Sequence, residues 1–244
     1  MIYPSMQNYD LNPCINISNN NGDVVVGNHK LIELIKSQID HGNKFFVFDL
    51  YPGVDKESLI SLLKGINYKL LIETDTCKLP ESDLHHMFDQ NITDDRVFAY
   101  MVNSRLENCF NMNEVANVKS NIEKHKDEVI FIVGVGASIF AKGDIHYYFD
   151  ITRWEIQLRF RSGSSNWMFD NPDAPNLTKY KIGFFVEWRL ADTHKIENFD
   201  SIDYWVDANV RDELKVIDKK SFYRAFEKIS KEPFRMNPYF DESA

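Results

Sequence analysis

The feature that most constrains this chain is a pair of strand-like runs between residues 129 and 161. Residues 129–133 are continuously apolar, and the sequence Gly-Val-Gly-Ala-Ser follows at once at residues 134–138. A second run closes on Asp150 and leads into a segment with three arginines, residues 151–161. Continuously apolar strands are typical of parallel sheets that are covered on both faces. Ligands of such sheets bind at the carboxyl ends of the strands, so we expect the Gly134 turn and the arginine segment to open at one edge.

Apolar strands and amphipathic helices alternate along the rest of the chain. Further strands are predicted over residues 24–26, 45–50, 69–73, 97–102 and 182–188. Helices are predicted over residues 30–40, 55–63, 80–87, 113–126, 151–161 and 212–230, with irregular chain at 162–177 and 192–209. We therefore expect an α/β fold of three layers, in which a mostly parallel sheet carries helices on both faces.

The length of 244 residues is enough for one large α/β domain, which we place at residues 24–230. Residues 1–23 are rich in asparagine and in turn-forming residues, so we expect an irregular N-terminal arm there. Residues 231–244 are interpreted as a tail that would link this domain to a further C-terminal domain.

Charge and cysteine content exclude several classes of protein. Lys and Arg total 28 against 37 Asp and Glu, a net charge of −9, which argues against a general nucleic-acid binder. No apolar run approaches the roughly 20 residues of a membrane helix, and the N-terminus lacks a signal-peptide core. Three widely spaced cysteines make neither a disulfide framework nor a zinc ribbon. We expect a cytoplasmic protein with no nucleic-acid or membrane partner.

The glycine turn is the first candidate ligand site. Gly134 and Gly136 would let backbone N–H groups approach an anion closely, and a helix that begins near Ser138 would add its positive end. The alternative is a tight turn in which Gly136 allows close packing. The third glycine and the downstream acid of the dinucleotide-binding motif are both missing.

The turn after residues 45–50 is a second candidate site. A phosphate loop reads Gly-x-x-x-x-Gly-Lys-Ser/Thr, and here the segment from Asp49 to Ser58 keeps one glycine and Lys56. Pro52 removes an N–H donor, and Glu57 would repel a phosphate. A capped helix after a proline turn is therefore the favoured interpretation, with Asp49 and Lys56 kept as ligand candidates.

Arginines on the predicted helix 151–161 are the third candidate. Arg153 and Arg161 fall on one strip of that helix, and Arg159 can pair with Glu155 at a spacing of four residues. Such arginines could bind phosphate with two hydrogen bonds each, or they could pair with local acids such as Asp150.

Carboxylates beside predicted strands are the remaining candidates. Asp75 with Glu73, and Asp94 with Asp95, could hold Mg²⁺, or they could cap turns and helices. His85 and His86 are adjacent and point in different directions on a helix, so they cannot bind one metal together. We expect no metal site within this chain.

The order of these segments resembles the uridine-kinase branch of the P-loop kinases. The resemblance runs over residues 44–162 and rests on the segments 45–58, 73–81, 129–134 and 144–161. It implies a P-loop-kinase-like fold with a degenerate phosphate loop, and a nucleotide with Mg²⁺ as the cofactors.

A second resemblance has more residues in common. The segments 48–55, 93–101, 134–138, 150–159 and 237–241 resemble the N-terminal region of bacterial class I mannose-6-phosphate isomerase-type proteins. In those proteins a zinc-dependent cupin domain follows, so the zinc and the catalytic residues would lie outside this chain.

Together these interpretations favour a non-catalytic or regulatory kinase-like domain of a protein of sugar-phosphate metabolism. It would bind a small phosphorylated ligand and form a homo-oligomer or act on a cupin domain in cis. One alternative is an active phosphotransferase, in which Arg153, Arg159 and Arg161 stabilise the phosphate, with Asp49 or Asp75 as base or Mg²⁺ ligand. Another is a structural or oligomerisation module that docks through residues 166–188.

Overall fold

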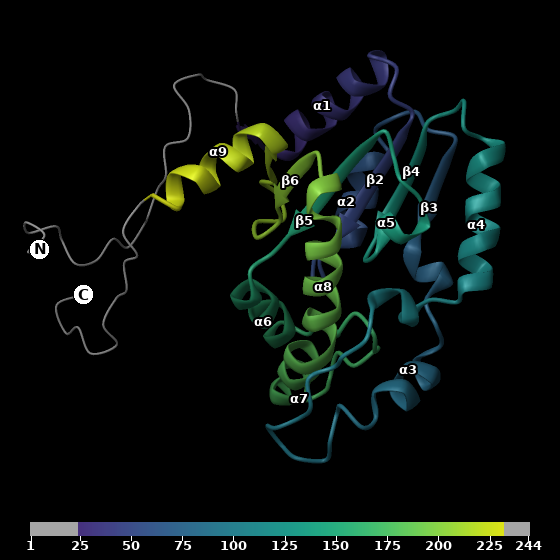
Figure 1. The fold of residues 1–244 in the computed structure, drawn as a ribbon. Helices are drawn as coiled ribbons and strands as arrows, with labels where there is room; N and C mark the ends of the chain where they lie inside the picture. Colours follow the sequence, from purple (N-terminus) through teal and green to yellow (C-terminus); the bar gives the residue numbers. More distant parts are fainter. Residues whose placement is uncertain (1–23, 232–244) are drawn as a thin grey trace, which may run out of the picture.

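One sheet organises the molecule (Figure 1). The computed structural model describes residues 24–231, and within them seven strands follow the order β1-β7-β6-β5-β2-β4-β3. The strands are β1 (Val24–Val26), β2 (Phe45–Leu50), β3 (Leu70–Glu73), β4 (Ile130–Gly134), β5 (Ile145–Asp150), β6 (Tyr204–Asp207) and β7 (Lys215–Asp218). The helices are α1 (Asn28–Asp40), α2 (Lys56–Leu63), α3 (Glu81–Phe88), α4 (Met112–Lys124), α5 (Ala137–Phe140), α6 (Arg153–Arg161), α7 (Asn176–Ile182), α8 (Trp188–Asn198) and α9 (Lys219–Ile229).

Most of the sheet is parallel, as the continuously apolar strands predict. β2 pairs in parallel with β4 and β5, β4 with β3, and β5 with β6, whereas β7 and β1 add to the edge in antiparallel fashion. In the register of the sheet, Asp49 of β2 lies opposite both Gly134 of β4 and Tyr148 of β5. The Gly134 turn and α6, which follows β5, therefore open at the same edge, as predicted.

Helices cover both faces of the sheet, because neighbouring residues of each strand point to opposite sides. Tyr147 of β5 donates a hydrogen bond of 2.7 Å to Gln38 of α1 on one face. Asp49 points to the other face, where it contacts α5 and α8. Figure 1 shows the same arrangement, with α8 in front of the strands and α2 behind them.

Four predicted segments differ from the structure. Residues 182–188 are not a strand but a buried helical stretch, in which a π-helical turn, Gly183–Glu187, joins α7 to α8. A short apolar run cannot be assigned to strand or helix by periodicity alone, and here burial on several sides of a helix produced the run. The segment 192–209, predicted to be irregular, contains the end of α8 and the strand β6.

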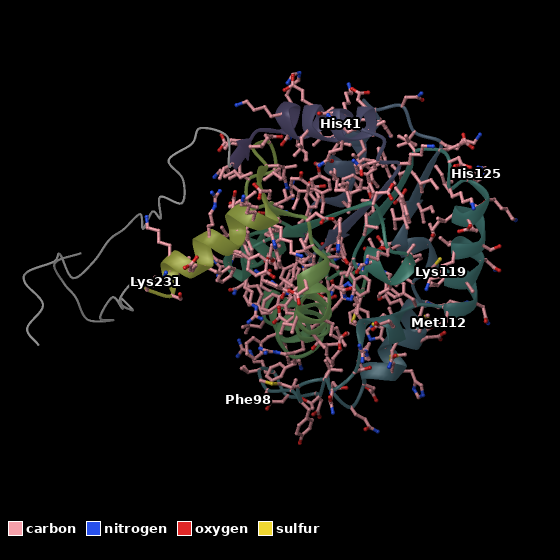
Figure 2. All side chains as sticks on the ribbon, turned by 45° about the horizontal axis from the view of Figure 1, so that its top comes forward. His41, Phe98, Met112, Lys119, His125 and Lys231 are labelled. Carbon is pink, nitrogen blue, oxygen red and sulfur yellow. The ribbon has the colours of Figure 1, made fainter. Side chains whose placement is uncertain are left out.

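The predicted strand at residues 97–102 is also absent. Its large side chains are exposed, with Phe98 at 73% and Tyr100 at 70%, and Figure 2 shows Phe98 at the rim of the molecule. The helix predicted at 212–230 begins only at Lys219, because β7 precedes it and turns the chain back along β6.

Two buried charges hold the loop between α6 and α7. Lys179 donates through Nζ to the carbonyl oxygens of Phe160 and Ser164, at 3.3 and 3.0 Å. Glu187 accepts a bond of 2.7 Å from the Met168 amide. Half of the large apolar side chains between residues 166 and 188 are buried against this framework, namely Met168, Phe169, Ile182, Val186 and Trp188, whereas Leu177 and Phe184 are exposed. The docking surface predicted from that segment therefore offers few of its apolar groups to a partner.

Within residues 24–231, no helix has both the length and the apolar character needed to span a lipid bilayer. The arm predicted at residues 1–23, the tail predicted at 231–244 apart from its first residue, and the 237–241 segment of the resemblance lie outside the described residues.

Substitution of Gly134 tests how tightly the carboxyl edge of the sheet is packed. Its φ is +139°, and a Cβ atom at this position would lie 2.0 Å from Oγ1 of Thr74. We expect Gly134→Ala to lower the free energy of unfolding by about 3 kcal/mol, from backbone strain and the clash together. Urea unfolding measures the change.

The matched control is Gly163→Ala. Gly163 also has a positive φ, +93°, but a Cβ atom at this position would have nothing within 4 Å. Its substitution should cost only about 1 kcal/mol of backbone strain. Equal losses for the two variants would contradict the packing against Thr74.

Candidate functional site

The nine site residues predicted from the sequence fall mainly into three places along the carboxyl edge of the sheet. Asp49, Gly136 and Ser138 meet in a buried group that we call the Asp49 cluster. Lys56, Asp75 and Arg159 line a cavity beside the turn from β2 to α2, which we call the β2–α2 cleft. Arg153 lines a larger cavity over β6 and β7, which we call the β6–β7 trough. Gly134 ends β4, and Arg161 lies outside all three.

The glycine turn forms an anion cradle, and the anion in it is the side chain of Asp49. Oδ1 of Asp49 accepts hydrogen bonds from the amides of Gly136 and Ala137, at 2.9 and 3.3 Å. Oδ2 accepts from the amide of Ser138 at 3.2 Å and from its hydroxyl at 2.6 Å. Gly136 adopts a left-handed φ of +73°, which turns these amides inward. The backbone donors that the sequence suggested for a phosphate are therefore already occupied.

His194 of α8 completes the Asp49 cluster. Its Nε2 lies 2.8 Å from Oδ2 of Asp49 and 3.0 Å from the hydroxyl of Ser138. Burial alone would raise the pKa of Asp49, but the charge and hydrogen bond of His194 outweigh it and lower that pKa to about 2. Burial would likewise lower the pKa of His194, yet Asp49 raises it above its usual value. Asp49 and His194 form a buried ion pair.

His146 of β5 stands next to this pair and is neutral. Burial lowers its pKa more than the nearby Asp49 and Asp203 raise it. Its Nδ1 lies 3.1 Å from the hydroxyl of Ser201, which donates its own proton to the carbonyl of Asn198. Nδ1 must therefore donate to Ser201, which leaves the lone pair on Nε2, 3.8 Å from Oδ2 of Asp49.

The Asp49 cluster contains the residue types of a hydrolytic triad without its geometry. In a triad, serine and aspartate bind opposite nitrogens of the histidine. Here Asp49 and Ser138 both contact Nε2 of His194, and the backbone amides that could stabilise an oxyanion already bind Asp49. The arrangement joins β2, α5 and α8 to one another and does not prepare a nucleophile.

The β2–α2 cleft has a volume of about 330 Å³ and lies where β2 and β3 end. Lys56, the first residue of α2, extends into it, and its Nζ lies 2.7 Å from Asp75 and 2.9 Å from Glu73. Partial burial would lower the pKa of Lys56, but hydrogen bonds to these two carboxylates raise it above its usual value. The indole of Trp167 donates to the second oxygen of Asp75 at 3.0 Å.

Two arginines form the opposite wall of the cleft. Arg159 is buried and donates to Glu155 at 3.0 Å and to the carbonyl oxygens of Gly53 and Ala208, each at 2.9 Å. Arg211 pairs with Asp55, which caps α2, at 3.2 Å. Arg211 was missed from the sequence, because it stands alone in an irregular segment that only the fold brings to the cleft. The lining carries three cations, Lys56, Arg159 and Arg211, against two carboxylates, Asp55 and Asp75.

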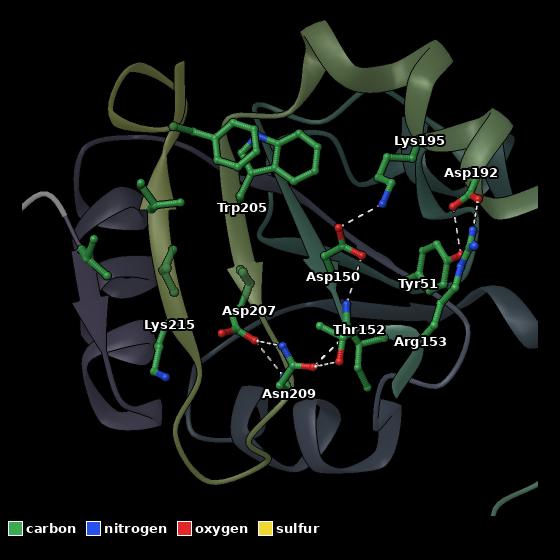
Figure 3. A pocket seen from close by; sticks show the side chains of 16 residues that line it. Tyr51, Asp150, Thr152, Arg153, Asp192, Lys195, Trp205, Asp207, Asn209 and Lys215 are labelled. Atoms are coloured by element: carbon green, nitrogen blue, oxygen red, sulfur yellow. Dashed lines mark hydrogen bonds and ion pairs between the residues drawn. The ribbon is translucent and has the colours of Figure 1, made fainter. Parts of the chain in front are cut away.

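The β6–β7 trough has a lining that includes the end of β5, the first residue of α6 and residues of β6, β7 and α8 (Figure 3). Arg153 pairs there with Asp192 of α8, which also accepts a hydrogen bond of 2.9 Å from the hydroxyl of Tyr51. Lys195 pairs with Asp150 at 3.0 Å. Asp192 and Lys195 were also missed, since the sequence suggested no helix at those positions.

The arginine strip predicted on α6 does not act as one surface. Arg153 lies in the trough and Arg159 in the cleft, whereas Arg161 donates to the hydroxyl of Tyr180 at 2.7 Å on the exposed side. The guanidinium of Arg161 also lies 5.4 Å from the ring of Trp154, which is itself exposed. The three guanidinium groups therefore cannot bind one phosphate together.

The carboxylates considered for Mg²⁺ do not fit a resident metal. Both oxygens of Asp75 accept hydrogen bonds from protein donors, and Glu73 contacts the same lysine. Oδ1 of Asp95 accepts from the amides of Val97 and Phe98, each at 2.7 Å, so it caps its own loop. Among residues 24–231, no group of three or more His, Cys, Asp or Glu side chains is placed to hold a metal ion.

Asp49 is expected to be the most costly carboxylate to neutralise. Asp49→Asn would remove the charge partner of the buried His194 and place an amide against the backbone donors of the glycine turn, so we expect a loss of about 3–5 kcal/mol in the free energy of unfolding. Urea unfolding at pH 7 measures it. Asp144→Asn is the control, because Asp144 also accepts from two backbone amides but on an exposed loop. A loss no larger than that of the control would contradict the buried ion pair.

The pH dependence of stability tests the protonation of His194. Its folded pKa is raised, so its contribution is complete below the unfolded value of 6.5 and is lost as the pH rises through the folded value. His146 has a lowered pKa and acts only below pH 6.5, where it favours unfolding as the pH falls. We expect the free energy of unfolding to decline as the pH rises above about 6.5, and His194→Gln to remove that decline. An unchanged slope in the variant would assign it to another group.

Comparison with known proteins places the chain in a family. Residues 27–231 match the sequence profile of the family described as domain of unknown function DUF8485. No curated protein matches the chain significantly. The matched range contains the helices α1 to α9 and the residues that were named above for the cluster, the cleft and the trough. The chain therefore belongs to the DUF8485 family.

Proposed function

We propose that this chain is a kinase-like ligand-binding domain that binds a small phosphorylated molecule in the β2–α2 cleft without transferring its phosphoryl group. The observation that carries the proposal is the convergence of Lys56, Arg159 and Arg211 on one cavity at the turn from β2 to α2. A phosphate loop occupies this position, between a strand and the helix that follows it. The side chain of Arg211 is 52% exposed, so part of its guanidinium remains accessible to an anion although it pairs with Asp55.

The contacts of the backbone amides, the lysine and the carboxylates that a kinase would use support binding without phosphoryl transfer. A kinase needs free backbone amides around the phosphates, and a lysine and metal ions that neutralise charge as it develops. In this chain Asp49 occupies the amides of the glycine turn, and Pro52 supplies none in the other turn. Lys56 is neutralised by Asp75 and Glu73, the carboxylates that a metal would need. Binding without turnover is the function that these contacts favour.

The class of ligand is suggested by the resemblance to mannose-6-phosphate isomerase-type proteins. A domain that precedes such an isomerase would act as a sensor of a hexose phosphate, or would present it to a cupin domain in cis. The cleft volume of about 330 Å³ falls within the range of small-molecule sites. We therefore propose hexose phosphates as the first ligands, and nucleotides as the second.

One observation favours the alternative of an active phosphotransferase. Lys56 and Asp75 lie 2.7 Å apart at the ends of the first two parallel strands in the chain, where a kinase would use both. Activity would require Lys56 to leave Asp75 and Glu73 when a nucleotide arrives. This alternative and the binding proposal make different predictions for turnover.

Isothermal calorimetry with mannose 6-phosphate, ATP and inorganic phosphate tests the proposal. We expect saturable binding of at least one of them, weakened tenfold or more by Arg211→Ala, which corresponds to about 1.4 kcal/mol. Arg161→Ala is the control, since Arg161 is an exposed arginine outside the cleft. No heat with any of the three, or equal effects of the two variants, would overturn the proposed site. Sustained ATP hydrolysis or sugar phosphorylation with Mg²⁺, lost in Lys56→Met, would instead establish the phosphotransferase.

A further inference from the structure

We propose that the β6–β7 trough is a second binding site, for a free amino acid with a large apolar side chain. The trough has a volume of about 530 Å³, within the usual range for sites of small organic molecules. One part of its lining is apolar and the other is charged, and both come from the exposed side of the β6–β7 pair and from α8 and α9 (Figure 3). The proposal rests on how these two parts are placed on the strands.

The apolar part consists of Trp205, Ile217 and Phe222. Trp205 of β6 and Ile217 of β7 are register partners, so their side chains lie next to each other on one face of the sheet. Phe222 of α9 stacks on Trp205, with the ring centroids 4.5 Å apart and the planes at 14°. Figure 3 shows Trp205 at one end of the trough, away from Asp207 and Asn209. This end would bury a hydrocarbon or aromatic group.

The charged part begins with a carboxylate that is held in position. Oδ1 of Asp207 accepts hydrogen bonds from the backbone and side-chain nitrogens of Asn209, at 2.9 and 2.6 Å. Asn209 is fixed in turn by Thr152, whose amide and hydroxyl donate to it at 2.9 and 2.8 Å. Oδ2 of Asp207 has no hydrogen bond or ion pair with any residue in the described range 24–231. A preorganised acceptor of this kind suits an ammonium group.

Lys215 stands across from this carboxylate. It is the register partner of Asp207 on β7, and opposite charges in that relation normally pair. No such pair forms here, and within the described residues the nearest carboxylate to Nζ is Glu213, at 3.8 Å. The side chain of Lys215 is 42% exposed, so its ammonium is accessible to a ligand. A carboxylate and an ammonium thus face the trough from neighbouring strands, and within residues 24–231 neither is matched by an opposite charge at hydrogen-bond distance: Oδ2 of Asp207 has no partner, and Lys215 has only the 3.8 Å contact with Glu213.

The net charge of the trough favours a different class of ligand from the phosphate proposed for the β2–α2 cleft. The lining carries three cations and three carboxylates, namely Arg153, Lys195 and Lys215 with Asp150, Asp192 and Asp207. Two of the cations are already paired, Arg153 with Asp192 and Lys195 with Asp150. A balanced lining gives no net attraction for a phosphate, whereas a zwitterion satisfies both unmatched groups at once. The α-ammonium would bind Asp207 and the α-carboxylate would bind Lys215.

The distance between the charged pair and the apolar pair along the strands determines where the side chain of such a ligand would lie. Trp205 precedes Asp207 by two residues and Ile217 follows Lys215 by two residues, so the apolar pair lies about 7 Å from the charged pair on the same face. An amino acid held by its charged groups would therefore direct its side chain towards Trp205 and Phe222. Phenylalanine, leucine and methionine have side chains that reach this far.

Calorimetry of the whole chain with single amino acids tests the inference. We expect saturable binding of L-phenylalanine or L-leucine, at least tenfold tighter than that of L-glutamate. Removing either charge from the ligand should weaken binding tenfold or more, as in phenethylamine, which lacks the carboxylate, and 3-phenylpropionate, which lacks the ammonium. This ligand series uses the unaltered protein, so it does not depend on the folding of a variant.

Two isosteric variants assign the binding to the trough. Asp207→Asn and Lys215→Gln should each weaken phenylalanine at least tenfold, whereas Lys119→Gln, on the exposed side of α4, should leave it unchanged. Absence of binding for every apolar amino acid, equal binding of the three phenyl compounds, or full affinity in both variants would overturn the inference. Arg211→Ala reports on the cleft alone, so failure of the trough is distinguishable from failure of the proposed function.

Discussion

The carboxylate of Asp49 is the group on which the rest of the structure depends. It lies in β2, the middle one of the five parallel strands, and five donors from the glycine turn, α5 and α8 converge on its two oxygens. An unpaired charge at this depth would be very costly, so the glycine turn, Ser138 and His194 must all be in place together. The turn after β4 therefore needs no external ligand to be ordered. A sequence pattern that is typical of anion binding is used here for an anion within the protein.

The two cavities at the carboxyl edge are separated by α6. Arg153 and Arg159 are six residues apart, which turns their side chains by about 240° around the helix. One guanidinium therefore lines the trough while the other lines the cleft. The two linings differ in apolar content, so one helix divides a mostly polar cavity from a partly apolar one.

Much of the fold was predictable because the parallel strands are buried on both faces and read as apolar runs. The segments around β2, β4 and β5 carry that signal clearly, and they establish the common edge. The stretch after α7 was not predictable, since a buried helix and a buried strand both give a continuous apolar run. That error concealed α8, and with it His194, Asp192 and Lys195. The candidate site could be predicted only where its residues follow a strand directly or close it. Asp49, Gly136 and Ser138 were singled out for that reason, although the sequence could not show that they bind each other.

Arg159 has a consequence that reaches beyond its own cavity. One guanidinium bonds to the carbonyl of Gly53, in the turn of the cleft, and to the carbonyls of Ala208 and Asn209, at the end of β6. Asn209 is also the residue that orients Asp207. A movement of either turn must strain or shift the other through this single planar group. Any linkage between ligands bound in the two cavities would pass through this group, and thermodynamics requires such a linkage to act equally in both directions.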